Sequence, residues 1–223
     1  MKWTHYNLEN WIENGCNKIT GDLVTELYLR SLKTLPPEIG NLINLRVFNC
    51  FYGSLTTLPP EIGNLINLQH FNCSSNKLKT LPSEIGNLIN LSSLICNGNF
   101  LITLPQEIGN LVNLSYFECN YNELITLPQG IGNLVNLKRF ECYKNKLTKL
   151  PQEISKITEL RNFKCSNNNL TSLSEIANLT NLHTLCCNNN KLTQLEISNL
   201  INLQILICHH NKLTTLPQEI CKL

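Results

Sequence analysis

Apolar residues recur along this chain with a period of 23 residues, and residues 68–90 show one full period. The sequence of this stretch is LQHFNCSSNKLKTLPSEIGNLIN, with apolar side chains at Leu68, Phe71, Cys73, Leu78, Leu81, Ile85 and Leu88. Phe71 and Cys73 alternate with polar neighbours, which is the period-two pattern of a short strand with one buried face. The first half of each period therefore predicts one strand.

The second half of the period predicts a turn and then a short helical segment. Asn76 is placed to turn the chain after the strand. Pro82 would fix φ at the first position of a helical turn, where no amide donor is needed. Ile85 and Leu88 are three residues apart, so the apolar side of that turn faces back toward the strand.

The cysteines show how often this unit repeats. Cys50, Cys73, Cys96, Cys119, Cys142 and Cys165 are each 23 residues apart, and Cys187 and Cys208 follow after 22 and 21 residues. One unit buries too few apolar side chains to offset the conformational entropy lost on ordering it, so neighbouring units must stack. Stacking predicts an α/β repeat solenoid in the shape of a horseshoe or arc. Its concave side is a parallel sheet of about nine strands, and its convex side carries short helices or 3-10 turns.

The N-terminal segment does not repeat. We divide the chain into an N-terminal helical cap at residues 1–22 and a repeat array at residues 23–223, with about nine repeats, the first degenerate and the last incomplete. Trp3, Leu8, Trp11 and Ile12 are expected to form the apolar stripe of a helix that ends near Gly15. This helix would cover the exposed end of the first repeat, and a partner-binding helix is the alternative.

Near the other end, two repeats are shorter than the rest. Leu173 is followed by Ser174 instead of proline, with one residue missing, and Leu195 runs directly into Glu196, two residues short. Shorter convex segments should change the curvature near residues 173–200. The last repeat restores LPQEI at residues 216–220 without an evident cap, which indicates an exposed apolar end, a truncated chain or a contact surface for a second copy.

The repeat LxxFxCxxNxLxxLPxEIGNLxN resembles the leucine-rich-repeat superfamily, in its typical 23-residue class. Its LPxEIGNLxNL half is similar to that of intracellular scaffolds of the Ras-pathway and Scribble type and of plant relatives. The resemblance covers about Leu23 to Leu223. It implies the solenoid fold and a partner of the small GTPase, kinase or phosphatase classes, without selecting among them. Such repeats are specific for fold and nearly silent on function.

Composition narrows the classes of function. The formal net charge is +2 and no block of Lys or Arg occurs, which argues against nucleic-acid binding. No run of 18 or more apolar residues is present, and residues 1–15 lack the apolar core of a signal peptide, so we expect neither a membrane span nor secretion. Eight of the eleven cysteines occupy one inward-facing position. Free thiols pack there as small apolar groups, so we expect reduced cysteines and a cytoplasmic location.

Asparagines form a second column. They are Asn76, Asn99, Asn122, Asn145, Asn168, Asn190 and Asn211. We expect their side-chain amides to satisfy the backbone groups left open where each strand turns, and to hydrogen-bond to one another along the column.

The sequence shows no pattern for catalysis or for a cofactor. Neither GxxxxGK[ST] nor GxGxxG occurs, so we expect no enzyme activity and no cofactor. The groups Cys186-Cys187 and Cys208-His209-His210 alternate in direction along their strands, so they do not converge on one ion. The cysteine column could bind a soft metal ion such as Cu(I) or Zn(II), but burial among apolar walls favours inert thiols.

The polar strand positions of the concave face are the candidates for binding, because they do not serve the core. The candidate partner-binding residues in the middle of the array are Tyr116, Glu118, Tyr121, Arg139, Glu141, Tyr143 and Lys164. Phe51 and Tyr52 form a second candidate region, or cover the irregular first repeats. Tyr and Arg are frequent in binding hot spots, and mixed charges orient a partner. The alternative is a solvated face whose ion pairs contribute little.

These patterns predict a non-catalytic protein-interaction module that binds a protein partner on the concave face, since an open sheet has no deep pocket for a small molecule. Two alternatives stay open. One is the recognition arm of a larger signalling protein or effector with a catalytic domain elsewhere, and the other is thiol or metal binding by the cysteine column. We expect a monomer, with an end-to-end homodimer through the C-terminal end as the alternative.

Overall fold

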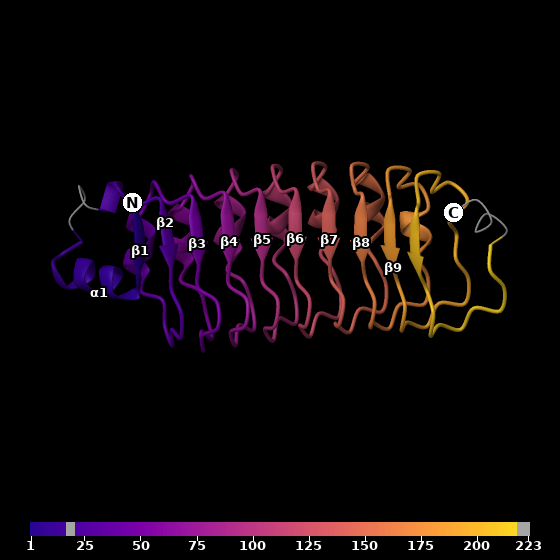
Figure 1. Cartoon of the computed structure of the whole chain (residues 1–223), viewed down its shortest axis with the longest axis horizontal. Coiled ribbons are helices and arrows are strands. Elements are labelled where there is room, and N and C mark those ends of the chain that lie inside the picture. The colour runs from indigo at the N-terminus through magenta and orange to yellow at the C-terminus, as the bar shows by residue number, and fades with distance from the viewer. Residues whose placement is uncertain (17–20, 218–223) are drawn as a thin grey trace.

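The computed structural model describes residues 1–16 and 21–217, which form one parallel sheet with short helical segments on one side (Figure 1). The ten strands are β1 (Lys2–Thr4), β2 (Glu26–Tyr28), β3 (Val47–Asn49), β4 (His70–Asn72), β5 (Ser93–Ile95), β6 (Tyr116–Glu118), β7 (Arg139–Glu141), β8 (Asn162–Lys164), β9 (Thr184–Cys186) and β10 (Ile205–Ile207). The α-helix α1 (His5–Glu13) follows β1. The 3-10 helices are η1 (Pro37–Asn41), η2 (Pro60–Asn64), η3 (Ser83–Asn87), η4 (Gln106–Asn110), η5 (Gln129–Asn133), η6 (Gln152–Lys156) and η7 (Ser174–Ile176). The predicted solenoid is confirmed.

Adjacent strands pair in register and in chain order, so equivalent residues of successive repeats lie side by side. Phe48 pairs with Phe71, Phe117 with Phe140, and Phe140 with Phe163. The rings of the last three stack, with centroids 5.4 and 5.6 Å apart. The buried strand position thus forms a continuous apolar column through the core.

The sheet has ten strands instead of about nine because the N-terminal segment adds one. Trp3 lies in β1, opposite Leu27 of β2, and not on the helix where the sequence placed it. The helix α1 carries Leu8 and Trp11, which are buried, and Ile12, which is partly buried. The two tryptophan rings lie 5.6 Å apart. A pair of aromatic rings tilted by 59° therefore packs at the N-terminal end of the sheet.

The LPxEIGN segments form the 3-10 turns. Pro82 is the N-cap of η3, one position earlier than predicted, and its carbonyl oxygen accepts a hydrogen bond from the Ile85 N–H at 3.1 Å. Ile85 and Leu88 are fully buried, as the pattern indicated. A Cβ on Gly86 would lie 2.5 Å from the carbonyl oxygen of Glu107 in the next turn. Glycine therefore allows successive turns to pack at this spacing.

The regular turns end where Ser155 stands in the position of this glycine. The next turn, η7, has three residues instead of five, and no helical turn is assigned between β9 and β10 in the described chain. The shortened segments predicted near residues 173–200 are therefore present. Most of the LPQEI stretch at 216–220, and the expected uncapped end, lie outside the described residues.

Asn122 shows how the asparagine column closes each turn. Its Oδ1 accepts a hydrogen bond from the Leu101 N–H at 3.0 Å, and its Nδ2 donates to the carbonyl oxygens of Cys96, Cys119 and Asn120 at 3.0–3.1 Å. The same contacts recur at Asn76, Asn99, Asn145, Asn168, Asn190 and Asn211. Within residues 21–217 these amides bond to backbone and not to one another. The prediction that the side-chain amides hydrogen-bond to one another along the column was therefore wrong.

The cysteine column lies in the core beside the phenylalanines. Its members Cys73, Cys96, Cys119, Cys142 and Cys165 are fully buried. Burial raises the pKa of these thiols, to about 12 for Cys73. All ten described cysteines are free. The column therefore consists of uncharged thiols that pack as apolar side chains.

Candidate partner-binding surface

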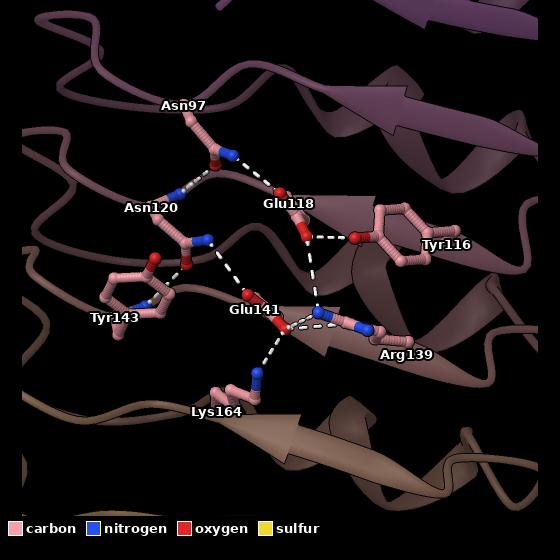
Figure 2. Close-up of polar contacts among 8 residues, drawn as sticks. All are labelled: Asn97, Tyr116, Glu118, Asn120, Arg139, Glu141, Tyr143 and Lys164. Carbon is pink, nitrogen blue, oxygen red and sulfur yellow. Dashed lines mark hydrogen bonds and ion pairs between the residues drawn. The ribbon is translucent and has the colours of Figure 1, made fainter.

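The predicted binding residues of the middle repeats lie together on the open face of the sheet, which is the face opposite the 3-10 turns (Figure 2). Tyr116 and Glu118 belong to β6, Arg139 and Glu141 to β7, and Lys164 to β8. The register places Tyr116 beside Arg139, and Glu141 between Glu118 and Lys164. We call these five residues, together with Asn97 and Asn120, the central cluster.

Glu141 is the buried centre of this cluster, with an exposure of only 3%. Its Oε1 lies 2.6 Å from Nη2 and 2.7 Å from Nε of Arg139, and 2.8 Å from Nζ of Lys164. Burial alone would raise the pKa of Glu141, but the hydrogen bonds and charges of Lys164 and Arg139 outweigh it and hold this pKa below its usual value. The ionised carboxylate therefore holds both cations in place.

Glu118 has a similar set of contacts one strand earlier. Its Oε2 accepts a hydrogen bond from Asn97 Nδ2 at 2.6 Å, and its Oε1 accepts one from the Tyr116 hydroxyl. Desolvation and this hydrogen bond raise the pKa of Tyr116. The Nη2 atom of Arg139 lies 3.7 Å from Glu118, and its guanidinium lies 5.0 Å from the centroid of the Tyr116 ring. Arg139 therefore joins the two carboxylates and the aromatic ring.

Asn97 and Asn120 were missed among the candidate binding residues. Asn120 is almost fully buried, and its Nδ2 donates a hydrogen bond to Glu141 Oε2 at 3.2 Å. The Oδ1 atoms of Asn97 and Asn120 accept hydrogen bonds from the backbone N–H groups of Asn120 and Tyr143, at 2.8 and 3.0 Å. Each asparagine stands 21 residues before the glutamate it contacts, directly after a buried cysteine. This constant spacing is the feature of the sequence from which the two asparagines could have been predicted as partners of the glutamates.

Tyr121, Tyr143 and Lys144 form a second group, in the turns after β6 and β7, which we call the aromatic edge. The two tyrosine rings meet edge to face with centroids 5.4 Å apart. The Lys144 Nζ atom lies 4.4 Å from the centroid of the Tyr121 ring and donates a hydrogen bond to its hydroxyl at 3.2 Å. The sequence predicted both tyrosines but not Lys144.

The backbone at the aromatic edge is in an unusual conformation for such large side chains. Tyr121 and Lys144 both have φ of 54°, in the left-handed region that favours glycine and asparagine. In the flanking repeats the equivalent positions hold Gly98 and Asn167. Tyr121 and Lys144 thus stand where the backbone would prefer smaller residues.

Phe51 and Tyr52 form a separate pair in the turn after β3. Their rings lie 5.3 Å apart, and the Arg30 guanidinium lies 5.0 Å from the centroid of the Phe51 ring. Strands β4 and β5 separate β3 from β6. The sheet therefore does not bring this pair into the central cluster.

A metal site and a membrane-spanning helix are both absent from the described residues. Within residues 1–16 and 21–217, no group of three or more His, Cys, Asp or Glu side chains could hold a metal ion. None of the helices in that part of the chain has the length and apolar character needed to cross a membrane. The open face instead offers charges, hydroxyls and aromatic rings spread over three strands, which suits a macromolecular partner.

Known proteins share the repeat. Models of a leucine-rich repeat region, of two leucine-rich repeats and of one leucine-rich repeat match residues 33–119, 158–202 and 202–223. Among curated proteins, no sequence matches the chain.

Three solved structures illustrate the likeness. A leucine-rich-repeat protein of Leptospira interrogans is 29% identical, with a TM-score of 0.52, over 88% of this chain and 75% of that one. The functional domain of InlJ from Listeria monocytogenes, which includes a cysteine ladder, is 25% identical, with a TM-score of 0.71, over 85% of this chain and 43% of that one. The plant peptide hormone receptor RGFR1, in complex with RGF2, is 28% identical, with a TM-score of 0.66, over 84% of this chain and 35% of that one.

The chain thus spans less than half of the InlJ and RGFR1 structures. The matched repeats and the in-register sheet agree with one another over most of its length. The chain therefore belongs to the leucine-rich-repeat proteins.

Proposed function

We propose that this chain is a non-catalytic protein-interaction module whose open sheet face binds a protein partner at the central cluster and the aromatic edge. Leucine-rich-repeat domains are generally protein-interaction modules, and the plant receptor RGFR1 was solved in complex with RGF2. The observation that carries the proposal is the buried Glu141 carboxylate, which holds Arg139 and Lys164 on the open face. Side chains fixed in this way lose little rotamer entropy when a partner binds.

The aromatic edge supports the same conclusion. In the left-handed region a residue other than glycine or asparagine costs on the order of 1 kcal/mol. Repeats on either side avoid this cost with Gly98 and Asn167, whereas Tyr121 and Lys144 do not. Tyrosine is among the residues most often found in binding hot spots. We therefore assign Tyr121 and Tyr143 to partner contact.

The test is capture of a partner from lysate of the source organism with the whole chain as bait. The informative variant combines Tyr121→Ala with Tyr143→Ala, and the matched control combines Glu107→Ala with Gln129→Ala on the exposed sides of η4 and η5. We expect a protein that is captured by the wild type and the control and is lost with the tyrosine variant. Identical captured proteins in all three samples, with unfolding curves unchanged, would exclude this surface.

A second candidate function is the recognition arm of a larger signalling protein or effector. The observation that favours it is the length of the InlJ and RGFR1 structures, of which this chain covers 43% and 35%. An antibody against residues 68–90 would show the size of the protein in its own cells. A band near the 25.4 kDa of this chain would exclude the larger protein.

We propose further that the module is a monomer in the cytoplasm. For the location, the support is that all ten described cysteines are free, which suits a reducing compartment. Cell fractionation checks the location, and light scattering of the purified chain checks the oligomeric state. Recovery of the protein from the culture medium would contradict the cytoplasmic location. A light-scattering mass equal to two chains would contradict the monomer.

A further inference from the structure

The cations of the central cluster keep hydrogen-bond donors that no described residue uses. Arg139 directs Nε and Nη2 to the glutamates, but no described residue accepts a hydrogen bond from its Nη1. Lys164 directs Nζ to Glu141 at 2.8 Å, and an ammonium group carries three N–H donors. None of these nitrogens is among the buried unpartnered atoms of the described chain. Both groups can therefore donate to a bound partner.

The positions of Arg139 and Lys164 bring these donors together. Nη2 of Arg139 and Nζ of Lys164 flank a single oxygen atom, Oε1 of Glu141 (Figure 2). The side chain of Glu141 is 4% exposed, whereas those of Arg139 and Lys164 are 40% and 34% exposed. A partner on the open face thus meets the two cations and not the carboxylate beneath them.

The surrounding charge has the same sign. At residues 138–144 and 161–166, which contain β7 and β8, the positive side chains are Lys138, Arg139, Lys144, Arg161 and Lys164. The one carboxylate in these two stretches is that of Glu141, and Glu118 of the neighbouring strand β6 adds a second beside Arg139. Lys138 and Arg161 are exposed and form no ion pair within the described chain. The surface therefore has an excess of positive charge beside an aromatic edge.

From this arrangement we propose that the open face recognises an acidic segment of its protein partner, with one aspartate or glutamate carboxylate bound between Arg139 and Lys164. This inference rests on the proposed function, because it names the chemistry of the partner at the same surface. The guanidinium and ammonium donors match carboxylate oxygens, and Lys138, Arg161 and Lys144 attract the neighbouring acidic residues. Tyr121 and Tyr143 supply apolar contact at the end of the segment.

The experiment selects binders from a phage-displayed library of random 12-residue peptides on the whole chain. Three variants are compared with the wild type: Lys164→Met with Arg161→Met, Tyr121→Ala with Tyr143→Ala, and Lys149→Met. The last removes an exposed lysine that lies beside Gln129 and Gln152, away from the central cluster. Arg139 is left unchanged because it contacts both Glu118 and Glu141, so its loss would remove the cation that the two carboxylates share.

We expect the selected peptides to carry Asp or Glu and to bind the Lys164/Arg161 variant at least tenfold more weakly, with less than a twofold change for Lys149→Met. Binding should also weaken as salt rises, because the attraction is electrostatic. Peptides without acidic residues that are lost only in the tyrosine variant would overturn this inference and leave the proposed function standing. A selection with no peptide lost in either variant would overturn both. Equally tight binding of a 12-nucleotide poly(dT) strand to the same residues would replace the acidic segment with a nucleic acid.

Discussion

Glu118 of β6 and Glu141 of β7 occupy directly paired positions of the sheet, and the Arg139 guanidinium contacts both carboxylates. Like charges on directly paired positions destabilise a sheet. Here Arg139 compensates for this repulsion, with Lys164 as a second cation on Glu141. The same arrangement that stabilises the sheet also presents two cations on its open face.

Replacing Arg139 with methionine should therefore destabilise the fold. The change leaves two paired carboxylates, one of them buried, so we expect a loss of about 1–3 kcal/mol, less than for a fully buried pair. Urea unfolding at pH 7 measures it. The control is Arg161→Met, which removes an exposed arginine without an ion pair in the described chain and should cost less than about 0.5 kcal/mol. Equal losses for the two variants would contradict the compensating role of Arg139.

The stability should depend on pH through Glu141. Because the pKa of Glu141 in the folded state lies below its value in the unfolded chain, the ionised carboxylate stabilises the fold above the unfolded pKa of about 4.3. This contribution is lost as the pH falls through the folded pKa. Urea unfolding between pH 7 and pH 3 should thus show a smaller fall in stability for Glu141→Gln than for the wild type. If the unfolding free energies of the two proteins fall in parallel with pH, Glu141 has the same pKa in the folded and unfolded states.

The asparagine column should be a major source of stability. Asn122→Ala leaves a buried N–H and buried carbonyl oxygens without partners, so we expect a loss of about 2–4 kcal/mol. The control Asn113→Ala removes one hydrogen bond, to the Ile89 carbonyl at the surface, and should cost under about 1 kcal/mol. Thermal unfolding of both variants separates the two cases. Similar melting temperatures would contradict this account of the column.

The aromatic edge should show a conflict between stability and binding. Tyr121→Asn relieves the left-handed backbone but loses the contact with Lys144, so the stability should stay unchanged or rise by up to about 1 kcal/mol. Capture of the partner should be lost. Urea unfolding and the capture assay are run on the same preparation. A destabilised variant that still binds its partner would reverse the interpretation of Tyr121.

Thiol reactivity should separate the column from the other cysteines. Burial raises the pKa of Cys119 well above that of a free thiol, whereas Cys16 and Cys208 are only partly buried. Alkylation of the folded protein with iodoacetamide at pH 8 should modify Cys16 and Cys208 at least tenfold faster than Cys119. Mass spectrometry of the digested protein measures each site. Equal rates would show that the core opens on the time scale of alkylation.

Much of the fold could be predicted because the structure of each repeat follows from the order of apolar and polar residues within that repeat. Phe71 and Cys73 alternate with polar residues, and Ile85 and Leu88 follow at helical spacing, so one period was enough to indicate the strand, the turn and the buried side of each. The identical period then required in-register stacking. Trp3 was misplaced because the N-terminal segment occurs once, and its strand exists only through pairing with β2.

The candidate site was predictable as a set of residues but not as an arrangement. Period two places Tyr116, Glu118, Arg139 and Glu141 on the open face, and the sequence determines that much without any structure. Their partners come from neighbouring repeats, as in the bonds from Asn97 to Glu118 and from Asn120 to Glu141. Only the register and the packing of adjacent strands decide which side chains meet, which carboxylate is buried and which cations stay exposed, because burial and pairing are properties of the stacked repeats and not of one.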